Sequence, residues 1–223
     1  MPLVSADFAP ETSISHLAIE RLGLVDYEEA LALQRKIHHE VAQNLSPNTF
    51  LLLEHPSIYT AGKRTLDSEK PVDGTAVINV DRGGKITWHG PGQLVGYPII
   101  RLANSHELVG FVREIETGLI NVCADFGINA ARIAGRSGVW IIDQQGERKI
   151  AAIGIRVASG VTMHGFALNV NPDLSYFNKI IPCGISDAQV TSLAQELGRD
   201  ITVEEVIPVV EQHLANSLNK VCA

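Results

Sequence analysis

Apolar side chains recur every three to four residues along three stretches of the chain, which predicts three amphipathic helices. The first covers residues 26–44, where an acidic first turn precedes an apolar face made of Ala30, Leu33, Ile37 and Val41. The other two cover residues 108–126 and 203–219.

Shorter apolar runs, rich in β-branched residues, lie between these helices and predict strands. They cover residues 50–54, 77–80, 94–101, 138–143, 149–158 and 162–170. No internal repeat, low-complexity linker or abrupt change of composition divides the 223 residues. We therefore expect one domain, residues 1–223, of the α/β or α+β class: a mixed β-sheet with helices grouped at its ends and on one face.

One stretch fits neither pattern. Residues 82–98 read RGGKITWHGPGQLVGYP, with five glycines and two prolines around one tryptophan and one histidine. Glycine permits backbone angles and close approaches that other residues resist, so this stretch favours main chain lying against a bound molecule. The alternative is a pair of tight turns between strands.

Composition and charge narrow the function classes. The chain is 45% hydrophobic and 19% charged, and no apolar run approaches the about 20 residues that span a bilayer. The N-terminus shows no secretory signal, so we expect a cytoplasmic protein without a membrane segment. A net charge of −7 argues against nucleic-acid binding through bulk charge. Residues 63–156 nevertheless hold 12 Lys and Arg against 10 Asp and Glu. This basic middle would suit an acidic partner, although chance clustering explains it equally well.

Three cysteines lie far apart in the sequence, which fits neither a disulfide framework nor, without CxxC pairs, a zinc site. Cys123 falls in an apolar helical pattern and is expected in the core, and Cys222 is expected at an inert, frayed end. Cys183 lies between proline and glycine in IIPCGIS. A thiolate on such a turn is a candidate nucleophile, and a structural cysteine is the alternative.

Lys149 opens a strand that is otherwise nearly all apolar, which makes it a candidate general base or charge partner of a thiolate. A strand-end lysine reaching to water is the alternative. Arg148 is expected on the opposite face, in solvent. His89 and His164 each precede a glycine and are candidate polar groups at a pocket wall. No third ligand, Walker motif or dinucleotide motif accompanies them, so neither a metal nor a nucleotide cofactor is expected.

Five segments taken together resemble the lipoyl(octanoyl) transferases: RGGKITWHGPGQLVGYP, GRSGVW (135–140), KIAAIGIRV (149–157), HGFALNV (164–170) and PCGISD (182–187). They occur in the family's order over roughly residues 26–197, leaving 1–23 and 200–223 outside the motif core. The resemblance implies the fold of the biotin and lipoate protein ligases and an acyltransferase without a cofactor. The implied substrates are octanoyl-acyl carrier protein and a lysine of lipoyl domains, in 2-oxoacid dehydrogenase complexes and the glycine cleavage H protein.

The resemblance also implies roles for particular residues. Cys183 matches the acyl-accepting cysteine, and Lys149 matches the lysine paired with it. The segments that match the acyl pocket comprise Arg82, Gly83, Gly84, Lys85, Ile86, Thr87, Trp88, His89, Ala152, Ile153, Gly154, Gly165, Phe166 and Ala167. Four arginines become candidates for docking an acidic partner: Arg132, Arg136, Arg148 and Arg156.

Three other functions stay open at this point. An ATP-dependent lipoate or biotin protein ligase of the same fold would adenylate a free acid and would not need Cys183. A non-catalytic binder of acyl or lipoyl proteins would need neither Cys183 nor Lys149. A thioesterase would release the free acid even with an acceptor present.

Overall fold

The computed structural model describes residues 17–104, 108–180 and 189–223. Its helices are α1 (Tyr27–Ala42), α2 (Leu108–Asp125), α3 (Leu193–Leu197) and α4 (Val203–Leu218), with 3₁₀ turns at Asp67–Glu69 and Leu174–Lys179. Its strands are β1 (Ala18–Leu24), β2 (Thr49–Glu54), β3 (Ile58–Ala61), β4 (Val77–Asn79), β5 (Thr87–His89), β6 (Gln93–Ile99), β7 (Ala130–Ile133), β8 (Arg136–Asp143), β9 (Gly146–Ala158), β10 (Val161–Asn169) and β11 (Gln189–Val190).

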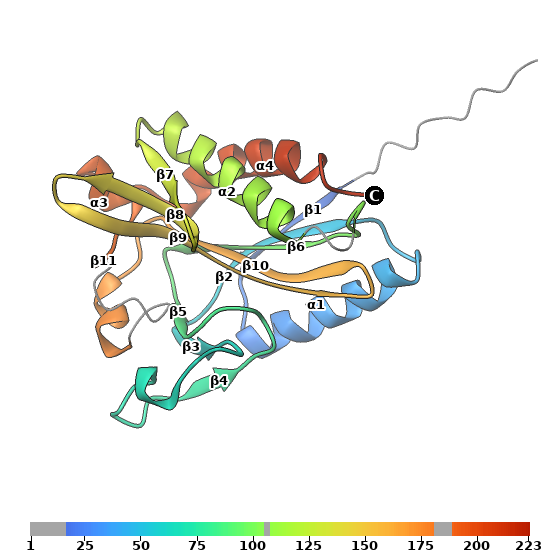
Figure 1. Cartoon of the computed structure of the whole chain (residues 1–223), viewed down its shortest axis with the longest axis horizontal. Coiled ribbons are helices and arrows are strands. Elements are labelled where there is room, and N and C mark those ends of the chain that lie inside the picture. The colour runs from blue at the N-terminus through green and yellow to red at the C-terminus, as the bar shows by residue number, and fades with distance from the viewer. Residues whose placement is uncertain (1–16, 105–107, 181–188) are drawn as a thin grey trace, which may run out of the picture.

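Most strands form one large sheet, in the order β1-β2-β6-β10-β9-β8-β7, with β11 added beside β9. The pairs β1–β2 and β9–β11 are parallel and the others are antiparallel, so the sheet is mixed as expected. Helices α2 and α4 pack on one face, and α1 lies against the other (Figure 1). The predicted fold class is therefore confirmed, but the expectation that helices cover only one face is wrong, since α1 covers the other.

A smaller sheet, in the order β4-β3-β5, lies on the same side of the large sheet as α1 (Figure 1). Strand β5 belongs to the glycine-rich stretch, and the chain turns from it directly into β6 of the large sheet. This connection holds the two sheets together at one end of α1. The space between them contains the candidate site.

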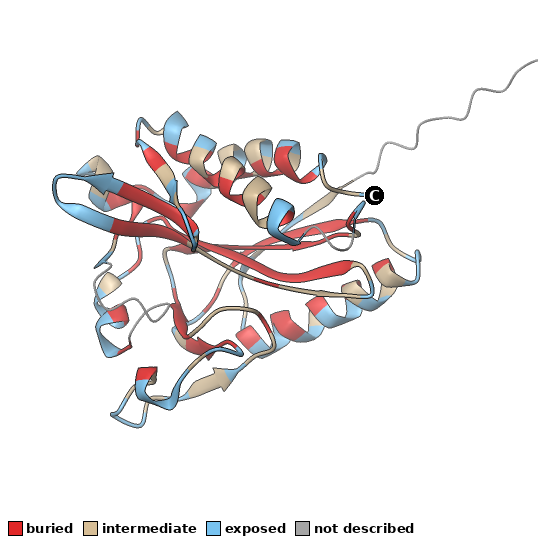
Figure 2. Ribbon diagram, in the orientation of Figure 1, coloured by how far each residue is buried: buried red, intermediate tan, exposed pale blue. Residues whose placement is uncertain are grey.

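Side-chain hydrogen bonds fix the ends of the long helices. The Asp26 carboxylate accepts from the backbone N–H groups of Glu28 at 2.8 Å and Glu29 at 3.3 Å, which begins α1. Thr202 and Glu205 form a capping box at the start of α4. Buried residues gather on the helix faces that contact the sheet and along both faces of the central strands (Figure 2). Within the described residues, no helix combines the length and apolarity needed to cross a membrane.

The three predicted helices and six predicted strands all occur, with ends shifted by a few residues. The sequence analysis missed the seven-residue strand β1 and the short elements β3, β5, β7, β11 and α3. Gln34 is fully buried on α1 although its side chain is polar. The side-chain oxygen of Gln34 accepts a hydrogen bond from the backbone N–H of His164 at 3.0 Å. The buried Gln34 therefore helps to hold the backbone beside the candidate site.

Candidate active site

A cavity of about 230 Å³ lies between two parts of the chain. Strands β9 and β10 of the large sheet form one side, and the glycine-rich stretch forms the other. The cavity is lined by Tyr27, Arg64, Arg82, Gly84, Lys85, Thr87, His89, Tyr97, Gly135, Arg136, Ser137, Lys149, Ala152, Ile153, Gly154, His164, Gly165, Phe166 and Ala167. Most residues that the family resemblance assigned to an acyl pocket are among them. Three are not: Gly83, Ile86 and Trp88. Ile86 and Trp88 are buried in a separate cluster with Phe177, and the N–H of Gly83 donates to the carbonyl of Ile155 at 3.0 Å.

The floor of the cavity is built from paired residues of β9 and β10. The pairs are Ala152 with Ala167, Ile153 with Phe166, and Gly154 with Gly165. A Cβ on Gly165 would lie 1.9 Å from the Gly96 carbonyl oxygen of β6, so only glycine fits there. The alanines and glycines among these residues leave a narrow space above the sheet that suits an unbranched chain.

Arg82 shapes the loop that covers this floor. Its buried guanidinium donates to the carbonyl oxygens of Thr60 and Lys85, both at 2.8 Å, and to the Thr60 hydroxyl at 3.0 Å. The backbone of Lys63 donates in turn to the Arg82 carbonyl at 3.2 Å. Arg82 therefore joins the loop after β3 to the loop before β5 as well as lining the cavity.

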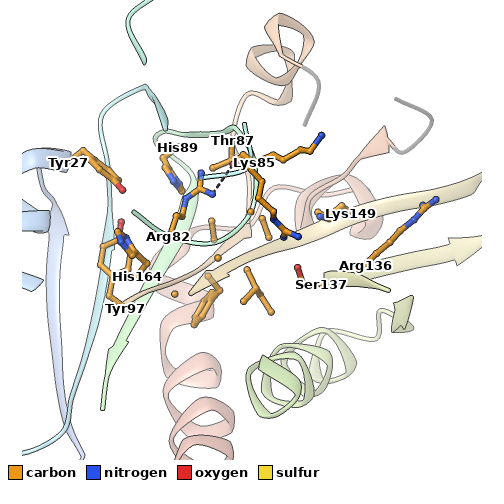
Figure 3. A pocket seen from close by; sticks show the side chains of 18 of the residues that line it. Tyr27, Arg82, Lys85, Thr87, His89, Tyr97, Arg136, Ser137, Lys149 and His164 are labelled. Carbon is orange, nitrogen blue, oxygen red and sulfur yellow. Dashed lines mark hydrogen bonds between the residues drawn. The ribbon is translucent and has the colours of Figure 1, made fainter. Parts of the chain in front are cut away.

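Lys149 lies at one end of the cavity, together with Arg136 and Ser137 (Figure 3). It is 8% exposed, and its ammonium nitrogen is 4.5 Å from the ring centroid of the buried Trp140, a cation–π contact. The expectation of a desolvated lysine is met, and Lys149 does not reach out to bulk water. The chain passes close by again soon after Cys183, because Val190 of β11 pairs with Lys149. Cys183 itself lies outside the described residues.

Tyr27, Tyr97 and His164 lie at the opposite end, with His89 beside them (Figure 3). The Tyr97 hydroxyl lies 2.8 Å from Nε2 of His55, whose Nδ1 lies 2.7 Å from the Val25 carbonyl. We assign the proton of His55 to Nδ1, since the carbonyl can only accept. Burial lowers the pKa of His55 and His164, and lowers that of His89 to about 3.

The sequence analysis missed several lining residues. Tyr27 begins a helix and Tyr97 lies within a strand, so nothing local to either residue signals a site. Gly135, Arg136 and Ser137 belong to the GRSGVW segment, which contributed to the resemblance; Arg136 was considered only for docking a partner, and Gly135 and Ser137 were given no role. His164 was treated as a polar group at a pocket wall, and it does line the cavity.

The expectation of an exposed Arg148 is wrong. Arg148 is 5% exposed and pairs with Asp143 at 2.8 Å and Glu196 at 3.0 Å. Its hydrogen bonds to Asp143 and then to Glu196 raise its pKa. Because two carboxylates already occupy its guanidinium, Arg148 is also a poor candidate for docking a partner.

The surroundings of the other two cysteines disfavour the thiolate form, in line with the expectation that both are inert. Cys123 is fully buried, and burial raises its pKa to about 12. Burial raises the pKa of Cys222 to about 11. The expected frayed end is wrong, however, since Cys222 forms a β-bridge with Leu102.

Comparison with known proteins identifies the family. The lipoyl protein ligase A/B catalytic domain matches residues 26–215. An octanoyltransferase of Salinispora arenicola is 60% identical over 205 residues, covering 91% of this chain and 96% of the relative. An octanoyltransferase of Streptomyces coelicolor is 50% identical over 250 residues, covering 92% and 94%.

Solved structures share the fold at much lower identity. A lipoate-protein ligase A bound with ATP superposes with a TM-score of 0.72 at 15% identity, covering 92% of this chain and 85% of that one. A biotin protein ligase from Aquifex aeolicus gives 0.52 at 14% identity, covering 92% and 70%. These likenesses support the fold alone. The sequence identity to the relatives is stronger evidence, because it identifies the family as well as the fold. This chain belongs to the octanoyltransferase family of acyltransferases, with a lipoyl protein ligase A/B catalytic domain.

Proposed function

We propose that this chain transfers an octanoyl group from octanoyl-acyl carrier protein to a specific lysine of lipoyl domains, through a thioester on Cys183. The acceptors are the lipoyl domains of 2-oxoacid dehydrogenase complexes and the glycine cleavage H protein, in the cytoplasm. The observation that supports this most is the cavity itself, whose small and apolar floor leads to the buried ammonium of Lys149. An unbranched acyl chain fits such a floor, and a reacting carbonyl belongs beside the charge.

In the first half-reaction, the Cys183 thiolate attacks the thioester carbonyl of the donor. A carbon–sulfur bond forms to Cys183, the bond to the carrier sulfur breaks, and the carrier thiolate leaves and takes up a proton from the Lys149 ammonium. Because one thioester replaces another, the acyl group keeps its transfer potential. No ATP is required.

In the second half-reaction, the amine of the acceptor lysine attacks the acyl-Cys183 carbonyl. An amide bond forms, the Cys183 thiolate leaves, and the amine loses a proton. A positive charge at Lys149 stabilises the Cys183 thiolate before and after transfer, and a neutral Lys149 accepts the proton from the incoming amine. The contact with Trp140 holds the Lys149 side chain in place for both roles.

The alternatives are less well supported. An ATP-dependent ligase has the same fold, but relatives 50–60% identical to this chain are named octanoyltransferases. A thioesterase would yield free octanoate as sole product in the presence of acceptor. A non-catalytic binder would form no covalent adduct.

The decisive experiment is the intact mass of the protein after mixing with octanoyl-acyl carrier protein in the absence of ATP. We expect the mass of one octanoyl group to be added to the wild type and to Cys123→Ser, but not to Cys183→Ser, because a serine hydroxyl lacks the nucleophilicity of a thiolate. Cys123→Ser is the matched control, since it removes a thiol that is buried and stays protonated. An adduct on Cys183→Ser, or its loss in Cys123→Ser alone, would refute the assignment.

A further inference from the structure

The cavity has a defined direction. At the Lys149 end, Gly135 and Ser137 are exposed and Arg136 is partly exposed. At the other end, Tyr27, Tyr97 and His164 are 3%, 4% and 1% exposed. A chain that enters beside Lys149 therefore ends against Tyr27, Tyr97 and His164, which we call the inner wall (Figure 3).

Packing holds the inner wall in position. The Tyr27 ring lies 5.0 Å from the His55 ring and stacks on His89 at 6.0 Å. Tyr97 is hydrogen-bonded to the same His55 at 2.8 Å. Tyr27 also packs with Leu31 and Met163 in a small apolar cluster. Because these rings constrain one another, the wall cannot retreat easily from a longer chain.

His164 reaches the wall through an unusual backbone conformation. Phe166 and Leu168, two and four residues further along β10, pack into the core beneath α2 and α4. Regular alternation would place His164 on that side too. Its φ of 60° is left-handed, and its side chain instead lies 2.8 Å from Asp81, with its Nε2 facing the carboxylate. Strain of this kind persists where the surrounding structure requires it, often at functional sites.

The distance between the two ends of the cavity suits an acyl chain of medium length. His164 pairs with Ile155, six residues after Lys149 on β9, so the two Cα positions are roughly 20 Å apart along the strand. The Lys149 and His164 side chains both line the cavity, so the space left between them is shorter than the separation of the two Cα positions. An extended eight-carbon chain covers about 8 Å at roughly 1.2 Å per bond.

The inner wall is also polar. The hydroxyl end of Tyr27 faces the other lining residues (Figure 3), and Tyr27 donates no hydrogen bond within the described part of the chain. Nδ1 of His164 is buried and has no hydrogen-bond partner there either. A methylene chain offers neither a donor nor an acceptor. A longer chain pressed past these groups would therefore meet both a steric and a desolvation penalty.

We propose that Tyr27 and His164 form a stop that limits the acyl group to about eight carbons, with Tyr27 as the residue that determines chain-length specificity. The proposal rests on the proposed function, since it concerns the acyl donor of the same reaction.

The test uses acyl-acyl carrier proteins that carry 6, 8, 10 or 12 carbons and measures kcat/KM for transfer to a lipoyl domain. Tyr27→Leu removes the ring and deepens the cavity, so the ratio of kcat/KM for 12 against 8 carbons should rise by about tenfold or more. Tyr27→Trp extends the wall inward and should raise the ratio for 6 against 8 carbons. Tyr27→Phe keeps the ring and should leave both ratios within about twofold of the wild type if the steric part dominates.

Leu31→Val is the matched control, because Leu31 packs with Tyr27 but does not line the cavity. It should lower stability without changing the length preference. Unchanged ratios in folded Tyr27→Leu, or in Tyr27→Trp should the leucine variant not fold, would overturn the proposal. Failure of the wild type to transfer octanoyl at all would instead refute the proposed function.

Discussion

Three histidines are buried around the inner wall, and their burial makes the stability of the folded protein depend on pH. His55, His89 and His164 are each less than 8% exposed, and burial is the first cause of the lowered pKa of each. Uncharged rings suit a wall that meets an acyl chain, because no ion is forced against hydrocarbon. In the unfolded chain the same histidines are in water and gain protons near pH 6.5.

His89 makes this cost measurable. Its pKa is about 3 in the folded protein, so between pH 6.5 and 3 the unfolded state binds more protons. Stability should therefore be fully present above pH 6.5 and fall as the pH is lowered, with His89 contributing a slope of up to about 1.4 kcal/mol per pH unit. His89→Gln should reduce the slope of unfolding free energy against pH by about that amount, as measured by urea unfolding between pH 7 and 4.5.

His39→Gln serves as the control, because His39 is exposed near the end of α1. This variant should keep the wild-type slope. Equal slopes for His89→Gln and wild type would mean that His89 takes up a proton while the protein remains folded.

Single residues differed in how far the sequence revealed them. Lys149 was recognisable because a charged residue in an apolar strand is unusual on its own. Tyr27 was not, because its role depends on α1 packing beside β10, which brings together residues that are distant along the chain. Arg148 was misjudged for a similar reason: its partner Glu196 lies on α3, a short helix that periodicity did not predict.

At the scale of elements, both interpretations of the glycine-rich stretch apply. One part of it lines the cavity, and another part forms a tight turn between strands. Gly84 lines the cavity, whereas Gly90 and Gly92 do not. Gly92 occupies the turn between β5 and β6 with a φ of 82°, and its carbonyl accepts the backbone N–H groups of Val170 and Asn171. A Cβ on Gly92 would lie 2.5 Å from the Asn171 carbonyl oxygen. Gly92 therefore does not border the cavity, and this turn is structural.

Replacing Gly92 with alanine should destabilise the protein through two separable effects. A left-handed backbone costs an alanine roughly 1–2 kcal/mol, and overpacking against Asn171 adds about 1–3 kcal/mol. Gly198→Ala is the matched control, since Gly198 has a φ of 65° but nothing within 4 Å of the added Cβ. Urea unfolding should show a loss of about 3 kcal/mol for Gly92→Ala and about 1 kcal/mol for Gly198→Ala.

Octanoyl transfer per folded molecule should stay near wild type in Gly92→Ala. Equal losses of stability in the two variants would show that Asn171 moves away without cost. Loss of transfer at unchanged stability would place the turn against the substrate after all.

Elements were predictable where the pattern was long. Helices α1, α2 and α4 each contain 16 to 18 residues, enough for a periodic apolar face to stand out. Strands of two to four residues, such as β3, β5 and β11, carry too few positions for an alternation. The order of the strands in the sheet could not be predicted from the sequence, for another reason. Strand β10 pairs with β6, some 70 residues earlier, and no local pattern records a pairing over that distance.

At the scale of the whole molecule, several basic residues from the middle of the sequence, residues 63–156, lie around the cavity. Five cationic residues line the cavity, namely Arg64, Arg82, Lys85, Arg136 and Lys149, and no Asp or Glu does so within the described residues. Glu69 pairs with Lys85, and Glu147 lies 2.6 Å from Arg136. These five cations surround the site, while the chain as a whole carries −7. Such an arrangement suits an acidic carrier protein, whose approach it would accelerate.

Salt should therefore slow transfer from the protein-bound donor. Raising NaCl from about 50 to 500 mM shortens the Debye length to a few ångströms and should lower kcat/KM for octanoyl-acyl carrier protein several-fold. Octanoyl-pantetheine, which presents the same thioester without carrier protein or phosphate, should react at a rate that salt hardly changes. The comparison separates docking from chemistry, because both donors use the same cavity. If salt slowed both donors equally, it would act on the catalytic site itself. If it slowed neither, the basic surround would play no part in capturing the carrier.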